Sequence, residues 1–278
     1  MKNFKTIVTL FSIFLFLNAN SQTDNGFYVS VNSGYNIGTG NANPYSSMIL
    51  GIGNSTQINA TTYEQEYLKI NFGTGINAAA TLGYMINKNI GFELGVNYLF
   101  GGKIKGSGTE LSGDYYNAEA SAKMIQIKPT IVFRAGFDKI NPYAKVGMVV
   151  GSGKITNSQN DKNGTNLTST KLELEGGMPI GFQASIGTIY KLTEKLSLFG
   201  ELNLISLEYA PEKGRLTESF KNGVDQLPTK SIRDKEIEFV QIITDIVAPS
   251  NPNEPNQIPK IPFSFSSFGL NIGLQFNF

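Results

Sequence analysis

The sequence predicts an all-β protein in which eight antiparallel strands close into a barrel, and three observations lead to this prediction. Apolar and polar residues alternate in eight segments of about ten residues each. The connections between the segments are alternately short and long. The polar side of the alternation consists mainly of Gly and small polar residues. A narrow interior requires side chains of this size.

The composition excludes several classes of protein. The 278-residue chain has no Cys and no His, so disulfide scaffolds, thiolate metal sites and catalysis through an imidazole lack their central residue. Its 23 Lys and Arg balance 22 Asp and Glu, and the resulting net charge of +1 argues against nucleic-acid binding. We therefore expect no catalytic residues, no metal, no cofactor and no nucleic-acid partner.

Residues 1–21 are predicted to be a signal peptide that is cleaved during export. Lys2 and Lys5 form a positively charged start, Ile7–Leu17 form an apolar core, and Ala19-Asn20-Ser21 supply a cleavage site of small residues. An uncleaved membrane anchor is the alternative. However, the apolar run is much shorter than the roughly 20 residues that a spanning helix needs. No Cys follows the cleavage site, so a lipoprotein is excluded.

The eight predicted strands follow in order within the mature domain, residues 22–278. Each alternates apolar and polar residues, whereas an amphipathic helix would place apolar residues three and four positions apart. The segments are Phe27–Ile37, Ile76–Tyr84, Phe92–Phe100, Ile125–Phe133, Ala144–Val150, Ile180–Tyr190, Leu196–Leu204 and Phe268–Phe278. In the fourth segment Pro129 has no N–H to donate, so we expect a bulge or a local widening there.

The connections distinguish a membrane barrel from a soluble β-sandwich. Three are short turns, around Asn87–Asn89, Asp138–Asn141 and Thr193–Lys195. Four are long, at about 39–71, 101–123, 154–171 and 208–260. Bacterial outer-membrane barrels have short periplasmic turns and long extracellular loops, whereas sandwiches show no such regular alternation. We therefore predict a transmembrane β-barrel with four long extracellular loops.

The last long connection contains two further patterns. Glu236–Val240 can extend a barrel strand above the membrane or form a short helix. The Pro-rich stretch Pro249–Pro262 is expected to be extended and mobile.

Charged residues on the inner face of the predicted barrel are few, and we expect them to lie inside it. They are Glu93, Lys128, Arg134, Lys145 and Glu201. Buried charges persist when they are paired, so we predict an ion-pair network that plugs the lumen. About eight strands leave a lumen that side chains fill, which excludes an obvious aqueous pore. The alternative is a narrow conduit in which the same charges select ions.

Aromatic residues near the strand ends are predicted to form girdles at the two membrane interfaces, where amphipathic rings are enriched. They are Tyr84, Phe92, Phe100, Tyr143, Tyr190 and Phe263.

Three segments carry a resemblance to a known family. They are Pro142-Tyr143-Ala144-Lys145-Val146-Gly147, Lys195-Leu196-Ser197-Leu198-Phe199-Gly200-Glu201-Leu202-Asn203 and Pro262 to Gly273. With the signal peptide, they resemble the porin-family outer-membrane β-barrel proteins of Bacteroidota, small eight-stranded barrels like OmpA and OmpX. The resemblance implies that the chain resides in the cell outer membrane. It also implies that Phe278 acts as the assembly signal read by the barrel-assembly machinery. Larger relatives append a peptidoglycan-binding domain, which we do not expect here because the chain stops at Phe278.

The expected function is a structural or surface-interaction role through the extracellular loops, because loops on a rigid scaffold carry binding sites. The expected partners are outer-membrane lipids, lipopolysaccharide, the barrel-assembly machinery and an unidentified surface partner. A narrow channel or a transporter of small solutes or lipids is the alternative. A lipid-modifying enzyme is not expected, because small outer-membrane enzymes generally use His as a base, and this chain has none.

Overall fold

The computed structural model describes residues 26–40, 44–242 and 251–278. The predicted signal peptide, residues 1–21, lies outside these ranges, and its cleavage stays a prediction. Among the described residues, none of the helices is both long enough and apolar enough to cross a bilayer.

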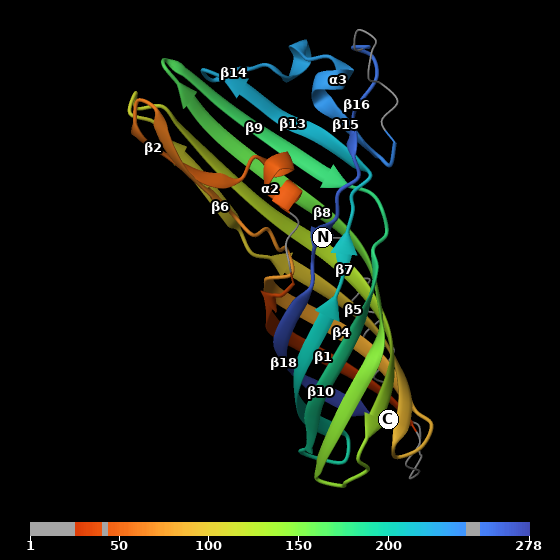
Figure 1. The fold of residues 1–278 in the computed structure, drawn as a ribbon. Coiled ribbons are helices and arrows are strands. Elements are labelled where there is room, and N and C mark those ends of the chain that lie inside the picture. Colours follow the sequence, from red (N-terminus) through yellow and green to blue (C-terminus); the bar gives the residue numbers. More distant parts are fainter. Residues whose placement is uncertain (1–25, 41–43, 243–250) are drawn as a thin grey trace.

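Eight antiparallel strands form a closed ring, which confirms the predicted fold (Figure 1). Each ring strand pairs with the next one along the chain, and the last pairs with the first, so the ring has no free edge. The ring strands are β1 (Gly26–Gly38), β4 (Gly75–Met85), β5 (Ile90–Gly101), β7 (Tyr115–Arg134), β8 (Ile140–Asn163), β10 (Ile180–Lys191), β11 (Leu196–Ser206) and β18 (Ser267–Asn277).

Short turns join the ring strands at one end of the barrel, at the three predicted places. In the β4–β5 turn, Asn87 Oδ1 accepts hydrogen bonds from the N–H groups of Asn89 and Ile90, each 2.9 Å long. In the β10–β11 turn, Thr193 Oγ1 accepts from the N–H groups two and three residues further along the chain, at 3.3 and 3.0 Å. These side chains replace backbone partners, and so they hold the turns tight.

The two faces of the ring have the opposite polarity to those of a soluble domain. Apolar residues of the predicted alternation point outward and are exposed, with Phe182 at 68% and Ile272 at 60%. Polar residues such as Ser30 and Asn271 point inward and are buried. An apolar exterior fits a bilayer, because the closed ladder pairs the backbone polar groups of neighbouring ring strands with one another.

The ladder between β7 and β8 is interrupted at one place. Pairing stops at Lys128 and Pro129 and resumes at Thr130 in the same register. The missing N–H of Pro129 explains the interruption. The unchanged register shows that the strand accommodates the proline without a bulge.

The largest difference from the prediction is at the other end of the barrel, where the connections at 101–123 and 154–171 are mostly strand. β7 has 20 residues and β8 has 24, whereas about 9–11 residues cross a bilayer. The inward positions of upper β7 are Ala118, Ala120 and Ala122, which are buried. Alanine is a poor strand former, so this alternation is weak in the sequence.

Further strands flank the upper parts of β7 and β8, and together they form what we call the upper sheet (Figure 1). β6, β2 and β3 continue from the free edge of β7, and β9, β13, β15 and β16 continue from the free edge of β8, with β14 paired to β13. Their bounds are β2 (Gly53–Asn59), β3 (Thr62–Tyr67), β6 (Ile104–Thr109), β9 (Asn166–Glu175), β13 (Lys213–Lys221), β14 (Val224–Asp225), β15 (Glu236–Val240) and β16 (Asn256–Pro259).

Short elements complete the upper part of the molecule. They are α2 (Pro44–Leu50), β12 (Glu208–Tyr209), η1 (Leu227–Thr229), α3 (Ile232–Lys235) and β17 (Phe263–Ser264), with β12 paired to β17. Residues 236–240 form neither a helix nor an extension of a ring strand, because they make a separate strand, β15, that pairs with β13 and β16. Part of the Pro-rich stretch forms β16, and residues 249 and 250 lie outside the described ranges.

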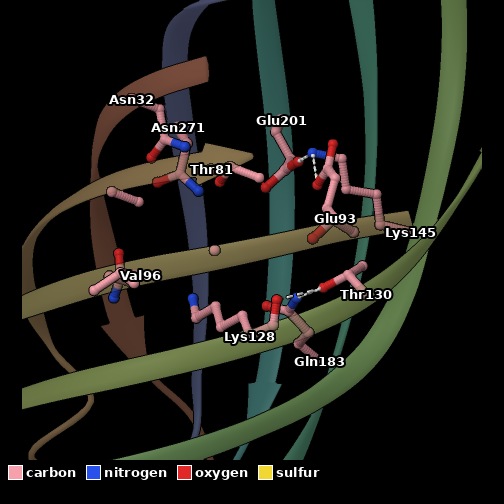
Figure 2. Close-up of a pocket in the computed structure, with 14 residues that line it drawn as sticks. Asn32, Thr81, Glu93, Val96, Lys128, Thr130, Lys145, Gln183, Glu201 and Asn271 are labelled. Atoms are coloured by element: carbon pink, nitrogen blue, oxygen red, sulfur yellow. Dashed lines mark hydrogen bonds and ion pairs between the residues drawn. The ribbon is translucent and has the colours of Figure 1, made fainter. Parts of the chain in front are cut away.

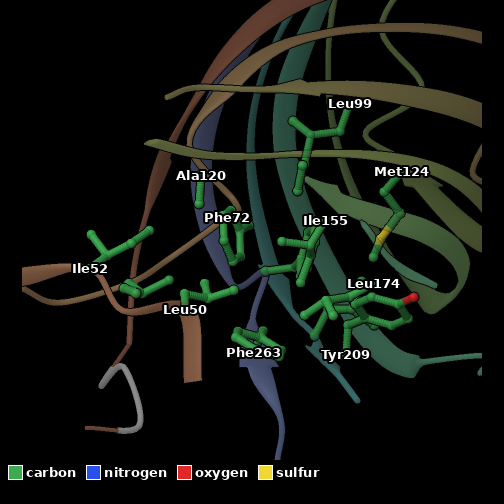
Figure 3. Packing of buried hydrophobic residues seen from close by; sticks show 14 of the residues in the cluster. Leu50, Ile52, Phe72, Leu99, Ala120, Met124, Ile155, Leu174, Tyr209 and Phe263 are labelled. Atoms are coloured by element: carbon green, nitrogen blue, oxygen red, sulfur yellow. The ribbon is translucent and has the colours of Figure 1, made fainter. Parts of the chain in front are cut away.

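A hydrophobic cluster, which we call the mouth core, fills the space where the barrel meets the upper sheet (Figure 3). Its buried residues are Leu50, Ile52, Ile70, Phe72, Leu99, Ala118, Ala120, Ala122, Met124, Val149, Ile155, Leu174, Ile205, Leu207, Tyr209, Phe239, Phe263 and Phe265. Phe263 is 0% exposed here, so its predicted place in a membrane girdle is wrong. Phe263 lies in β17, the short strand before β18, and its side chain packs in the mouth core.

Candidate functional site

Most side chains in the lumen of the barrel are polar, and they come from every ring strand, whereas Tyr143, Ile189 and Phe199 form a small hydrophobic cluster among them. Buried polar examples are Ser30, Asn36, Asn77, Glu93, Asn97, Gln126, Thr130, Gln183, Ser185, Ser197, Glu201, Asn203, Asn271 and Gln275. Many of them bond across the lumen, as Gln183 does by donating to Thr130 Oγ1 at 2.6 Å. Such bonds compensate for the removal of polar groups from water.

Lys145 is the centre of the charged part of the lumen (Figure 2). Its Nζ lies 3.0 Å from a carboxylate oxygen of Glu93 and 3.0 Å from one of Glu201. These residues come from β8, β5 and β11, so the ion pairs connect three ring strands. Both carboxylates are buried, each residue being 8% exposed. A buried cation between two carboxylates is stable because each charge has its counter-charge within contact.

Two tyrosines complete the charged group. Tyr28 Oη donates to Glu93 Oε1 at 2.5 Å, and Tyr143 Oη donates to Glu201 Oε2 at 3.0 Å. Each carboxylate therefore has a lysine and a phenol as partners, which satisfies more of its lone pairs. The predicted place of Tyr143 in a membrane girdle is wrong, because its inward position on β8 puts the ring into the lumen.

Arg134 lies in the lumen as predicted but forms contacts other than ion pairs. Its guanidinium carbon lies 4.6 Å from the centroid of the Tyr28 ring, and its Nη2 donates to Gln275 Oε1 at 3.1 Å. Stacking on an aromatic face and a hydrogen bond to an amide hold this cation in place. Arg134 therefore braces Tyr28, which in turn holds Glu93.

Lys128 is the fifth predicted charge, and it faces a lumen cavity of about 40 Å³ (Figure 2). Within the described ranges it has no carboxylate partner within ion-pair distance. The ion-pair network predicted from five residues therefore consists of three, Glu93, Lys145 and Glu201. The cavity is large enough for roughly three waters, at about 10–15 Å³ of accessible volume each. A second lumen cavity, next to Arg134, measures about 10 Å³.

The mouth core closes the lumen on the side of the upper sheet. The ring centroids of Phe72 lie 6.0 Å from Phe263 and 5.8 Å from Phe265. Tyr209 packs edge-on against Phe265 at 5.7 Å and donates its hydroxyl to Gly153 O at 2.8 Å. All four rings are essentially inaccessible. These packed aromatic rings lie on the upper-sheet side of the polar lumen residues.

Phe278, the predicted assembly signal, follows the last ring strand. Its N–H donates to Phe27 O at 3.1 Å, so the end of the chain lies at the seam where β18 meets β1. Its role in assembly stays a prediction. Within the described residues, no group of three or more acidic side chains is arranged to hold a metal ion.

Comparison with known proteins gives one family and several similar structures. A family model described as outer membrane protein beta-barrel domain matches residues 6–226. No curated protein matches the chain in sequence. The crystal structure of Neisserial surface protein A is 12% identical and covers 91% of this chain and 97% of its own, with a TM-score of 0.39. A major outer membrane protein from Thermus thermophilus is 12% identical, with 91% and 99% covered and a TM-score of 0.42.

Proposed function

The chain belongs to the outer membrane protein beta-barrel domain family, and we propose that it is a closed barrel whose task is to hold the upper sheet outside the cell as a binding surface. The mouth core is the observation that carries this proposal. Its buried aromatic rings pack against inward residues of both the ring strands and the upper sheet, and we propose that they close the lumen. A passage for ions or solutes would need a hydrated path through this layer.

The filled lumen supports the same proposal. The ion pairs of Lys145 bind three strands together, and the cavities beside them hold a few waters at most. We propose that these charges stabilise a filled interior. Neutralising a charge in such a group affects stability, whereas in a channel it would change ion selectivity.

The positions of the short turns support an upper sheet that lies outside the cell. Outer-membrane barrels have their short turns in the periplasm, and the three short turns lie at the end opposite the upper sheet. Apolar side chains are exposed at its loop tips, Leu111 beyond β6 and Leu167 at the start of β9. Lipopolysaccharide and an as yet unidentified surface molecule are the proposed partners at this end, and outer-membrane lipids surround the ring.

Assembly and chemistry complete the proposal. The C-terminal strand, ending at Phe278, is proposed to be recognised by the barrel-assembly machinery after the signal peptide has been removed. We propose no enzymatic activity, because the chain lacks the imidazole base that lipid-trimming barrels use. Lipid A of cells with and without the protein should have the same mass spectrum, and a new lipid A species would contradict this part of the proposal.

Conductance tests the closed barrel. Mature protein refolded into planar bilayers is expected to give no discrete current steps. The double variant Phe263→Ala/Phe265→Ala removes two rings of the mouth core. Its recording shows which current steps a barrel with an opened mouth gives, for comparison with the unchanged protein. Steps in the unchanged protein that shift in selectivity when Glu93 or Arg134 is neutralised would establish the narrow-channel alternative.

Photo-cross-linking on intact cells tests the surface role. A photoreactive residue at position 167, on the upper sheet, is expected to yield adducts with proteins or lipopolysaccharide of the cell surface. The matched control is position 182, where Phe182 faces lipid and only lipid adducts are expected. If position 167 gives no adducts in cells where position 182 reacts with lipid, the upper sheet has no surface partner.

A further inference from the structure

The upper sheet contains a cavity of about 220 Å³, far larger than either lumen cavity. It lies between the helix α2 on one side and the segment α3–β15 on the other, with β8, β9 and β13 between them. This volume approaches the lower end of small-ligand pockets, about 300 Å³. It therefore has room for a small organic molecule.

One wall of the cavity carries a buried acceptor without a donor. Asn157 is 3% exposed, and its Nδ2 donates to Leu50 O at 2.7 Å. Its Oδ1 has no hydrogen-bond partner among the described residues. Gln159, the next inward residue of β8, donates to the same carbonyl at 2.8 Å. The two amides thus fix the end of α2, and Asn157 Oδ1 stays buried without a donor, which is costly unless a ligand supplies one.

The remaining lining is aliphatic on one side and balanced in charge on the other. Ile49, Leu172, Leu216 and Ile237 supply the apolar surface, and Thr170 adds a hydroxyl. Asp234 and Lys235 contribute one charge of each sign, and the Asp234 carboxylate is already bonded to the Ser231 hydroxyl at 2.7 Å. A lining without net charge favours a neutral ligand over an ion.

We propose that this cavity binds a neutral small molecule the size of one sugar unit, with hydroxyl or amide N–H donors on one edge and an aliphatic face on the other. The Asn157 side-chain oxygen accepts from a ligand donor, and the aliphatic wall covers the apolar face. The inference rests on the proposed function in one respect, the location of the cavity outside the cell.

Saturation-transfer NMR on the refolded full-length mature chain tests the inference. The micelles are made of lauryldimethylamine oxide, because detergents with sugar headgroups would compete. The probes are glucose, N-acetylglucosamine and free isoleucine. Saturation of at least one of the sugars is expected, and no saturation of the zwitterionic isoleucine. A response to glucose assigns recognition to hydroxyl donors, and a response to N-acetylglucosamine alone assigns it to the amide N–H.

Three variants locate the binding. Leu216→Trp fills the cavity and should abolish the sugar signal. Arg215→Trp places the same ring on the opposite, exposed face of β13 and should leave it unchanged. Asn157→Leu removes the free acceptor and should weaken binding about tenfold, the change expected from one lost hydrogen bond. A shift in gel mobility on heating shows that each variant is folded. If Leu216→Trp does not fold, the sugar affinity of Asn157→Leu tests the inference alone.

Absence of a sugar signal, binding of isoleucine alone, or a sugar signal that survives both Leu216→Trp and Asn157→Leu would each overturn the inference. Bilayer conductance is measured separately, so the two proposals fail independently. A silent barrel without sugar binding would refute this inference alone. A conducting barrel that still binds sugar would refute the closed barrel alone.

Discussion

The lumen and the mouth core are both buried, yet their chemistry is opposite. The lumen is packed mainly with amides, hydroxyls and an ion-paired Lys145, with one small cluster of Tyr143, Ile189 and Phe199, whereas the mouth core consists of aromatic and aliphatic side chains. The difference follows from the surroundings of the two regions. Around the lumen the outer face meets lipid and must be apolar, so polar residues go inside. Around the mouth core the outer face meets water, and the usual hydrophobic interior returns.

A single strand shows both arrangements. In the lower part of β7, Ile127 points outward and Gln126 inward. A few residues away, Met124 points inward into the mouth core and Lys123 points outward into solvent. The direction of the side chains is unchanged, and only their polarity reverses. The reversal between Lys123 and Ile125 marks the level at which β7 leaves the membrane.

The largest expected effect comes from removing the central charge of the lumen. Lys145→Met leaves Glu93 and Glu201 buried without their cation, which should lower the free energy of unfolding by about 3–5 kcal/mol. Urea unfolding in lipid vesicles measures it. The triple variant with Glu93→Gln and Glu201→Gln added should regain most of the loss. Equal losses in the single and triple variants would show that the charges are uncoupled.

The mouth core should respond to lost volume rather than to charge. Leu174→Ala is expected to cost about 2–5 kcal/mol, from the lost transfer free energy and the remaining cavity. Leu167, exposed on the same strand, provides the control, and Leu167→Ala should change stability by less than about 0.5 kcal/mol. A loss for Leu174→Ala as small as that for Leu167→Ala would mean that the stability of the upper sheet does not depend on this core.

A lysine scan on β7 should locate the membrane boundary. Ile127→Lys places a charge on the lipid face and should cost about 2–4 kcal/mol if it lies near the bilayer centre. Ser121→Lys points to the same side above the boundary and should be close to neutral. Unfolding in vesicles compares the two. A neutral Ile127→Lys would contradict the assignment of the outer face to lipid.

The smallest expected effect is a surface ion pair of the upper sheet. Lys154 Nζ lies 2.7 Å from Glu173 and 3.1 Å from Glu175, and the bond to Glu173 raises the pKa of Lys154 above its ordinary 10.5. A raised lysine pKa stabilises the fold below 10.5, and this contribution is lost as the pH rises through the folded-state pKa. The pair is largely exposed, so Lys154→Met should cost less than about 1 kcal/mol at pH 8. The difference should vanish at strongly alkaline pH, and a difference that grows there would contradict the pairing.

The ring could be predicted from sequence because the outward residues of its strands have a strong preference for β structure. Within the bilayer the outward Val, Ile, Leu and Phe all meet lipid, so the period of two is clear there. The lumen charges follow from the same parity, as Glu93 and Lys145 show. Tyr143 has the parity of Lys145, and this was the available signal for its inward position. Proximity to a strand end suggested the girdle instead.

The upper sheet and its cavity could not be predicted in the same way. In upper β7 and β8 many inward residues are Ala, Asn and Gln, such as Ala120 and Asn157, which carry little β signal, and few are strong strand formers like Ile155. The polarity of the alternation also reverses in mid-strand. A stretch of sequence that spans the reversal therefore has apolar residues on both faces, and its period of two is lost. Phe72 and Phe263 meet from segments far apart in the chain, and no local spacing encodes that contact.

The uninterrupted course of β7 and β8 from the turn end to the loop tips has a mechanical consequence. Two strands that share a ladder over nearly their full length form a stiff lever, with one arm embedded in the bilayer and the other projecting from it. A force applied at the tip would be transmitted along β7 and β8 to the barrel wall, because no flexible linker lies between the tip and the barrel in these two strands. A molecule bound at the tip, as proposed above, would therefore keep a fixed orientation relative to the cell envelope.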